Sequence, residues 1–376
     1  MVERYRRPLE LLLFAVVPAL VAVAMFAVAR SDHSLSVDFH NELYPEAKKL
    51  LDWENPFPPP GSAVWYGHNM IWPPVAAFLV APLTLFPAGT ADWVMALLGL
   101  ACFMGSLRIV GVRDWRIYGV FALWPQVIGE IRVSHLTPLL CVLLALVWRY
   151  RDTRFAPGVA LGLAGAIKFF LWPVGIWLAA IGRLRELVVA AAVAAASLLL
   201  VLPFTSLHDY FHVLIELGRT FDQDSYSPFG FLMQIGAPEA LARAVMFALG
   251  AALLVACWRR QSFGFAVAAA LVLSPIVWLD YYAVAAIPLA VVLPRLTWIW
   301  LAPLATWGLL SAGIGAGNGW GSARVLLVFG IVFALIVRAE RRTEAEGESH
   351  SPATVGTPAE PRAARLVSDL KSDTAL

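Results

Sequence analysis

Long apolar runs separated by short polar segments dominate the pattern of this chain. An α-helix crosses a hydrocarbon core of about 30 Å with roughly 17–25 apolar residues, and several runs reach that length. The runs are continuous, whereas the strands of a membrane barrel alternate apolar and polar residues over short segments. The pattern predicts about twelve membrane-crossing helices, several of them short. They fall at residues 9–29, 91–110, 117–130, 136–148, 156–167, 169–181, 186–204, 238–258, 263–278, 281–294, 297–312 and 322–338.

The predicted fold is an all-α polytopic membrane bundle, because backbone groups in lipid must find their hydrogen bonds within a helix. A long polar segment, 31–70, follows the first helix and forms the first loop. The apolar segment 72–87 carries four prolines and is predicted to be a re-entrant or poorly centred helix. Residues 340–376 have few large apolar groups, so they are expected to form a disordered tail after a membrane domain over 1–339.

The basic residues set the orientation of these helices, because Lys and Arg are enriched in cytoplasmic loops. Counting 72–87 as a full crossing would reverse every later helix and place most arginines outside. We therefore predict that both termini and the tail are cytoplasmic and that the loop 31–70 is extracytoplasmic. The arginines that this orientation places inside are Arg4, Arg6, Arg7, Arg108, Arg113, Arg116, Arg149, Arg151, Arg154, Arg183, Arg185, Arg259, Arg260, Arg295, Arg338, Arg341 and Arg342.

Composition excludes several other classes of protein. The chain is 60% hydrophobic and 14% charged, which is more apolar surface than a soluble domain can bury. The net charge of +2 is too small to indicate a nucleic-acid partner. The three cysteines lie far apart in apolar runs, so no disulfide framework is expected. The first apolar run follows basic residues as in a signal peptide, but its length and the lack of a cleavage site predict a retained helix.

The same orientation gathers polar residues at the outer face. A polar side chain within a membrane is costly unless it is paired or hydrated. One polar cavity that opens outward would accommodate all of them. These residues are Asp38, His40, His68, Asn69, Glu130, Arg132, His135, Lys168, Asp222, Asp224 and Asp280.

Asp38 and Lys168 are the strongest candidates for chemistry. Asp38 could act as a general base that takes a proton from a hydroxyl group, or it could be a helix cap or a solvated loop acid. Lys168 lies among apolar residues at the outer turn between 156–167 and 169–181. Its ammonium could meet a lipid phosphate as a point charge, or it could extend to the headgroups.

The other polar residues admit two interpretations each. Asp280, where two predicted helices meet, could bind sugar hydroxyls, assist the base, or pair with Lys168 or Arg132; it could also be an interfacial loop acid. His135 could line the cavity or be solvated. The remaining candidate substrate-binding residues are His68, Asn69, Tyr281 and Tyr226, of which the last follows an amphipathic stretch that could instead lie on the membrane surface.

Motifs of soluble enzymes are absent from the sequence. It contains no Walker loop, no dinucleotide-binding GxGxxG after a strand, no HExxH and no GxSxG. Asp38 has no adjacent acid at metal-ligand spacing. We therefore expect no metal and no cofactor.

A series of short motifs resembles glycosyltransferase family 87, a family of the GT-C superfamily. Its order and spacing carry the resemblance more than any one motif. The series consists of Val37–Asp38–Phe39, Leu43–Ala47, Asn55–Phe57, Trp72–Ala77 with Ala81–Leu83, Gly162–Lys168, Ser225–Ser227 with Gly230–Phe231, and Ser274–Trp278 with Tyr281.

The resemblance implies a GT-C-like fold with a catalytic membrane domain and a long first outer loop. It implies that Asp38 is the catalytic base and that Lys168 lies near a donor phosphate. Independently of the resemblance, Arg132 is a second candidate cation for that phosphate. The expected reaction moves a sugar, mannose above all, from a polyprenyl-phosphate donor to a glycolipid or cell-envelope glycan. The expected location is the extracytoplasmic face of a bacterial plasma membrane, among membrane lipids. The sequence departs from the family pattern at Asp280, where many members have His, and after Lys168, where Phe169 replaces Pro.

Two alternatives remain open at this point. A transporter or flippase for lipid-linked sugars would also have an outer polar cavity, although it should show internal repeats, and none is clear. A scaffold for envelope synthesis would tolerate loss of the Asp38 carboxylate, whereas an enzyme would not.

Overall fold

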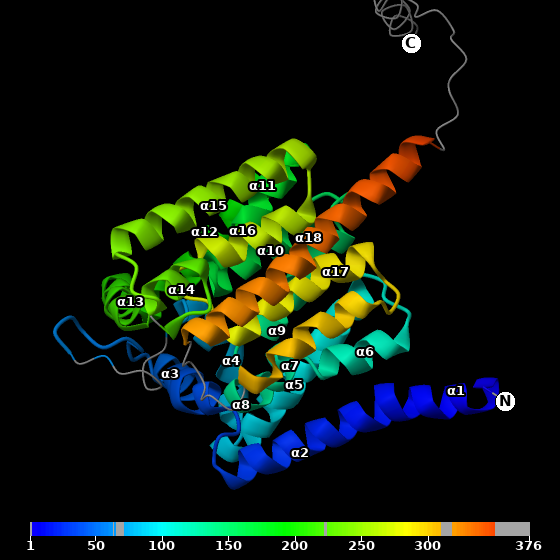
Figure 1. Ribbon diagram of the computed structural model, residues 1–376. Helices are drawn as coiled ribbons and strands as arrows, with labels where there is room; N and C mark the ends of the chain where they lie inside the picture. Colours follow the sequence, from blue (N-terminus) through cyan, green and yellow to red (C-terminus); the bar gives the residue numbers. More distant parts are fainter. Residues whose placement is uncertain (1, 63, 65–70, 222–223, 310–317, 350–376) are drawn as a thin grey trace, which may run out of the picture. The chain divides into compact units, whose positions relative to one another are not determined.

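The computed structural model describes residues 2–62, 64, 71–221, 224–309 and 318–349. The chain divides into two units, Met1–Ala339 and Glu340–Leu376. All regular structure in the described residues is helical, as predicted (Figure 1). The helices of the first unit enclose a continuous apolar core, which runs from Phe39 to Ile336 in the sequence.

Five helices are long and apolar enough to cross a membrane by length and composition, among the described residues. The first combines α1 (Val2–Leu11), a π-helical turn (Leu12–Val16) and α2 (Val17–Ser31). The others are α5 (Ala88–Ile109), α12 (Leu184–Val201) with the 3-10 turn Leu202–Phe204, α15 (Glu239–Arg260) and the first part of α18 (Gly319–Ser349).

Shorter helices fill the space between these five. They are α3 (Tyr44–Leu51), α4 (Pro74–Val80), α6 (Trp115–Ala122), α7 (Pro125–Ile128), α8 (Glu130–Val133), α9 (Thr137–Arg149), α10 (Ala156–Ile167), α11 (Pro173–Ala180), α13 (Leu207–Phe221), α14 (Pro228–Gln234), α16 (Phe263–Leu273) and α17 (Ala286–Val292). The 3-10 segments among them are Ala81–Leu85, Phe169–Leu171, Leu279–Ala285 and Trp298–Leu309, and a second π-helical turn covers Phe39–Leu43.

The predicted count of about twelve crossing helices is not confirmed, because several predicted spans are broken. The segment 117–130 forms α6, α7 and the start of α8 in place of one helix. Trp124 is extended, as residues before proline usually are, and Pro125 opens a new helix. The segments 281–294 and 297–312 contain 3-10 helix, and Pro303 lies inside the second of them.

Two other segments differ in detail from the sequence expectations. The apolar segment 72–87 forms α4 and the 3-10 segment Ala81–Leu85, and neither is long enough to span a bilayer. Helix α18 continues to Ser349, ten residues into the segment 340–376 that was expected to be disordered.

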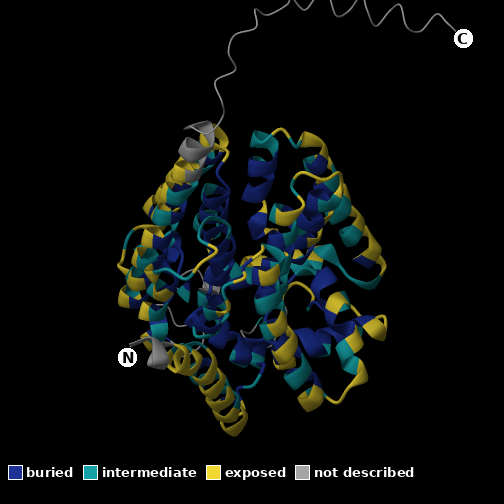
Figure 2. Ribbon diagram, turned by 90° about the vertical axis from the view of Figure 1, so that its right-hand side faces the viewer, coloured by how far each residue is buried: buried dark blue, intermediate teal, exposed yellow. Residues whose placement is uncertain are grey.

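The outer helices expose apolar side chains, which is the arrangement expected for contact with lipid. Val23 of α2 is 66% exposed and Leu200 of α12 is 75% exposed. Figure 2 shows this pattern as exposed outer helices around a buried interior. Contiguous apolar surface of this kind marks an interaction with membrane or protein.

Helix α10 lies against α12 with almost no space between the two backbones. Gly158 and Gly162 of α10 face carbonyl oxygens of α12, at Glu186 and Ala190, and an added methyl group at either glycine would collide with them. Small residues four apart allow this close approach in membrane helix pairs. The contact fixes the position of Lys168, which directly follows α10.

Candidate active site

Asp38 stands at the end of the loop that follows α2, immediately before the π-helical turn Phe39–Leu43. The loop is held in place by Ser36, whose backbone is left-handed with φ 55°. The Ser36 hydroxyl donates to the backbone oxygen of Asp92 in α5, at 2.9 Å, and lies 2.7 Å from the hydroxyl of Ser134. This anchoring buries the Asp38 carboxylate against the bundle.

His135 lies in the short non-helical segment between α8 and α9. Ser134 before it also has a left-handed backbone, with φ 51°. A non-glycine residue in this region carries strain, and such residues cluster at functional sites. The turn directs His135 Nε2 to the Oδ2 atom of Asp38, with which it forms a hydrogen bond.

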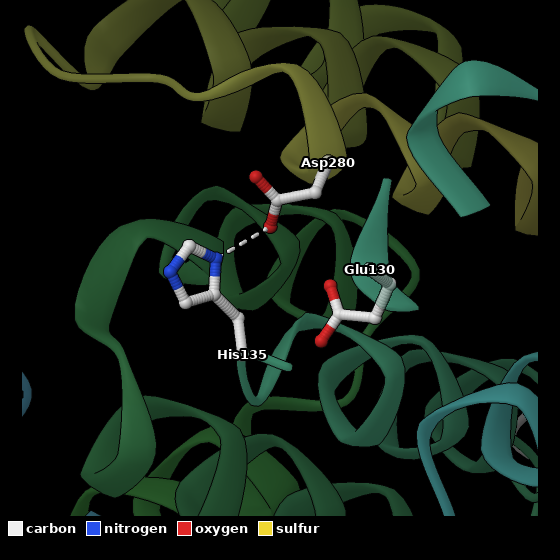
Figure 3. A group of neighbouring side chains, drawn as sticks. All are labelled: Glu130, His135 and Asp280. Carbon is white, nitrogen blue, oxygen red and sulfur yellow. Dashed lines mark hydrogen bonds and ion pairs between the residues drawn. The ribbon is translucent and has the colours of Figure 1, made fainter. Parts of the chain in front are cut away.

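Asp280 completes a line of three buried side chains. It lies in the 3-10 helix Leu279–Ala285, and its Oδ2 atom is 3.2 Å from His135 Nδ1. The hydroxyl of Thr137 donates to the same oxygen at 2.6 Å. The imidazole of His135 therefore bridges two carboxylates that are 242 residues apart in sequence (280 − 38). Figure 3 shows the His135–Asp280 contact.

Glu130 opens α8 beside these groups and is completely buried. Among the described residues, neither of its carboxylate oxygens has a hydrogen-bond partner. Figure 3 shows its carboxyl group near that of Asp280 and the ring of His135. A buried polar group without a partner is uncommon and calls for an explanation, such as a ligand.

Lys168 presents its ammonium between two aromatic rings. Its Nζ atom lies 4.0 Å from the centroid of the Trp72 ring and 3.8 Å from that of Tyr281. The atom is buried and has no hydrogen-bond partner among the described residues. The rings of Phe170 and Tyr281 stack, with centroids 5.6 Å apart. The rings hold the cation by cation–π attraction without using its hydrogen atoms, so all three remain available.

Charge links Lys168 to the acidic line. The carboxylates whose charge acts on it are Asp280, Glu42, Asp38 and Glu130. Trp72 also contacts His135, with ring centroids 5.6 Å apart. Asp38, His135, Asp280 and Lys168, which the sequence analysis assigned to one cavity, thus form one electrostatic group.

Arg132 points to a different group. Its Nε atom donates to the Ser34 hydroxyl at 3.0 Å, and its guanidinium pairs with Asp32 at 3.4 Å. The pKa of Asp32 is lowered, first by the hydrogen bond from Ser34 and less by Arg132. The described contacts of Arg132 therefore lie at the end of α2, and its role toward a donor phosphate stays a prediction.

Tyr226 holds the segment that leads to Asp280. Its backbone N–H donates to the Val277 carbonyl at 2.9 Å, and its carbonyl accepts from the Tyr282 hydroxyl at 2.8 Å. Tyr226 and Tyr281 are both buried. Their predicted contact with substrate is not tested by these bonds. His68 and Asn69 lie outside the described residues.

Sequence reasoning did not assign roles to Glu130, Thr137 and Trp72. Glu130 begins a polar stretch that continues through Arg132 to His135, in a region otherwise apolar. That stretch was a signal that the predicted span 117–130 ends in a site. Only the folded turn at Ser134 shows that Glu130 and His135 face the same point.

The arrangement can accept a proton and stabilise an anion. Asp38 offers a carboxylate that is oriented by His135, and Lys168 offers an unpartnered ammonium. A general base needs hydrogen-bond reach to the proton it removes, and a fixed cation stabilises charge that develops on a leaving group.

A further buried acid lies in α3. Burial raises the pKa of Glu46, although the ammonium of Lys49 lies 3.0 Å from its carboxylate.

A family model for glycosyltransferase family 87 matches residues 71–279, more than half of the 376 residues. The match contains His135 and Lys168, stops one residue before Asp280, and begins after Asp38. No curated protein and no solved structure matches the chain. The family consists of membrane glycosyltransferases, in agreement with the apolar helices and the sequence motifs. The chain therefore belongs to glycosyltransferase family 87 and is a multi-pass membrane glycosyltransferase.

Proposed function

We propose that this glycosyltransferase moves mannose from a polyprenyl-phosphate donor to a hydroxyl group of a glycolipid or cell-envelope glycan. The observation that carries the proposal is the buried line Asp38–His135–Asp280 beside the unpartnered ammonium of Lys168. A base and a fixed cation are the two groups that direct displacement from a phosphate requires.

The reaction proceeds in one displacement. The acceptor oxygen attacks the anomeric carbon while the bond from that carbon to the phosphate oxygen breaks. The acceptor proton passes to Asp38, and the electron pair of the broken bond stays on the phosphate. One displacement inverts the configuration, so a β-linked donor gives an α-linked product. No second carboxylate is needed as a nucleophile, in contrast to retaining glycoside hydrolysis.

Lys168 meets the departing phosphate in this mechanism. Phosphate is already a weak base, so it needs charge stabilisation and no protonating acid. The Nζ atom has no hydrogen-bond partner among the described residues, and its place between the Trp72 and Tyr281 rings leaves its three hydrogens for phosphate oxygens. Preorganised donors of this kind contribute strongly because they need not rearrange during the reaction.

His135 orients Asp38 and Asp280 orients His135. The hydrogen bond from Nε2 engages the Oδ2 atom of Asp38. Asp280 is itself fixed by the Thr137 hydroxyl. The proton acceptor thus has a defined direction.

The distribution of charge supports an extracytoplasmic site. Arg113 in the loop between α5 and α6, Arg116 in the first turn of α6 and Arg295 in the loop after α17 line a common pocket with Asp114. Lys and Arg favour cytoplasmic loops. We propose that these loops and both termini are cytoplasmic and that Asp38 faces the outer side of a bacterial plasma membrane.

The test is transfer by the purified full-length protein in lipid nanodiscs. Radiolabelled polyprenyl-phosphate-mannose serves as donor, membrane glycolipid extract serves as acceptor, and product is counted after thin-layer separation. Asp38→Asn should reduce the rate by about 10²–10⁴-fold, the usual contribution of a general base. Asp114→Asn removes a carboxylate outside the site and is the matched control, with an expected rate within about twofold of the native protein.

Equal rates for Asp38→Asn and the native protein would remove Asp38 from its role. Donors that carry glucose or arabinose test the assignment of mannose. Movement of labelled lipid between leaflets without any product would instead favour a transporter.

A further inference from the structure

We infer that Glu130, His135 and Asp280 form a binding site for one divalent cation, of the Zn²⁺ or Mn²⁺ type. The three residues come from separate parts of the chain: the start of α8, the turn before α9, and the 3-10 helix Leu279–Ala285. This inference does not depend on the identity of the donor or the acceptor.

The ligand atoms already lie close together. One atom from each side chain is within 4.8 Å of the other two. His135 Nδ1 and Asp280 Oδ2 are 3.2 Å apart. Bond lengths of 2.0–2.2 Å at a tetrahedral cation place neighbouring ligand atoms about 3.3 Å apart, so this pair needs little movement.

Glu130 supplies the independent observation that points to a ligand. Its side chain is completely buried, and among the described residues neither carboxylate oxygen has a hydrogen-bond partner. In Figure 3 the carboxyl group of Glu130 points toward the side chains of His135 and Asp280. Buried carboxylates are normally paired or bound to a metal. A cation at this point satisfies Glu130 and the other two residues together.

The charge balance of the cluster also favours a cation. Asp38, Glu130 and Asp280 are buried carboxylates, and Glu42 is a fourth near Lys168. The bases whose charge acts on this group among the described residues are Lys168 and His135, which are fewer than the four carboxylates. A divalent cation reduces the excess negative charge in an apolar surrounding.

The cation would also define the form of His135. Bound through Nδ1, the ring is neutral and carries its proton on Nε2, which then donates to Asp38. A histidine ligand usually donates its other ring N–H to a carboxylate or carbonyl in this way. One imidazole and two carboxylates suit Zn²⁺ and Mn²⁺ better than Ca²⁺, and three protein ligands leave a coordination position open.

The prediction of metal-independence was based on the first loop alone. Asp38 has no neighbouring acid there, and that criterion cannot detect ligands from three distant segments. The candidate ligands are 5 and 150 residues from Glu130 in the sequence (135 − 130 and 280 − 130).

The experiment measures metal content in the absence of donor and acceptor. The full-length protein is purified in detergent with a streptavidin-binding tag, incubated with ZnCl₂ or MnCl₂, dialysed and analysed by plasma mass spectrometry. The native protein should retain about one equivalent of one of the two metals, and Glu130→Gln less than about a tenth of an equivalent. Glu186→Gln changes another buried carboxylate, in α12, and should retain the metal.

A second measurement keeps the inference testable if Glu130→Gln does not fold. A cation that binds the native state raises the thermal midpoint, so the bound metal should raise it by several degrees and EDTA should reverse the change. Loss of metal in Glu130→Gln, with a monodisperse elution profile, supports the site. Native protein that binds neither metal and shows no shift, or equal binding by Glu130→Gln, overturns it. Neither result bears on Asp38 as a base, which the transfer assay tests separately.

Discussion

Two clusters of charged side chains in this protein differ in whether their polar atoms have hydrogen-bond partners. At the loop before α6, Asp114 accepts hydrogen bonds from Arg116 Nε at 2.9 Å, from an Arg116 terminal nitrogen at 2.9 Å and from the Leu296 backbone N–H at 2.9 Å. Near Asp38, the oxygens of Glu130 and the Nζ atom of Lys168 are buried without partners among the described residues. In the partly exposed region, both carboxylate oxygens of Asp114 have hydrogen-bond partners. In the buried region, several polar atoms have none among the described residues.

The difference separates a stabilising role from a binding role. Folding favours regions in which each polar group has a partner, because an unpartnered buried group costs the full free energy of desolvation. A protein keeps such groups where a ligand supplies the partner, and perturbed ionisable groups cluster at functional sites for this reason. The Asp114 cluster should therefore affect unfolding, and the Lys168 cluster should affect turnover.

Within this comparison of the two clusters, the largest expected effect comes from removal of the unpartnered cation. Lys168→Met should lower the transfer rate at saturating donor by about 10²–10³-fold, because the departing phosphate loses its fixed counter-charge. Arg116→Met removes a cation that is already paired and should leave the rate within about twofold. Initial rates in nanodiscs check both. A Lys168→Met rate near that of the native protein would break the comparison.

The next effect concerns His135. Its replacement by Asn should lower the rate by about 10–100-fold, the usual cost of losing a residue that orients a functional group. The loss should fall on kcat and leave the KM for the donor within about twofold, because the Asp38 carboxylate loses its orientation while Lys168 keeps its place. Rates measured over a range of donor concentrations separate this positioning role from a purely structural one. A raised KM with an unchanged kcat would overturn the positioning role of His135.

A smaller effect, on the free energy of unfolding, is expected at the Asp114 cluster. Asp114→Ala removes the N-terminal cap of α6, the partner of Arg116 and the acceptor of the Leu296 N–H. The free energy of unfolding should fall by about 2 kcal/mol, with transfer per folded molecule unchanged. Chemical unfolding in detergent measures this. Asp152→Ala removes a 74% exposed carboxylate and should change the free energy by less than about 0.5 kcal/mol.

The smallest effect is the pH dependence of the difference in free energy of unfolding between the native protein and Asp114→Ala. Hydrogen bonds from Arg116 lower the pKa of Asp114 to about 2, from a usual value of 3.8. A lowered pKa means that the carboxylate stabilises the folded state above the unfolded pKa and that this contribution is lost as pH falls. The gap between native protein and Asp114→Ala should thus be constant at neutral pH and shrink from about pH 4 to about pH 2. A constant gap across this window would show that Asp114 acts through packing.

The sequence predicted the all-helical class and the proximity of several candidate residues. Asp38, His135, Lys168 and Asp280 were assigned to one cavity from their positions at helix ends, and the structure brings them together. Continuous apolar runs report on burial alone, so the breaks at Pro125 and Pro303 were not located.

The directions of the side chains could not be predicted from the sequence. Arg132 and His135 are three residues apart, yet the left-handed backbone at Ser134 sends His135 toward Asp38 while Arg132 contacts Asp32. Such a turn depends on the contact between Ser36 and Ser134, which joins segments distant in sequence. The role of Glu130 was missed for the same reason.

The close contact of α10 with α12 has a mechanical consequence. Because Gly158 and Gly162 leave no gap between the two backbones, we expect the helices to move as one body. Lys168 is attached to the end of α10, and α12 is one of the two least buried of the five candidate membrane spans. A bilayer whose thickness tilts α12 will therefore displace the ammonium relative to Asp38. The host membrane's thickness thus becomes a variable that sets how well the enzyme's charges are aligned.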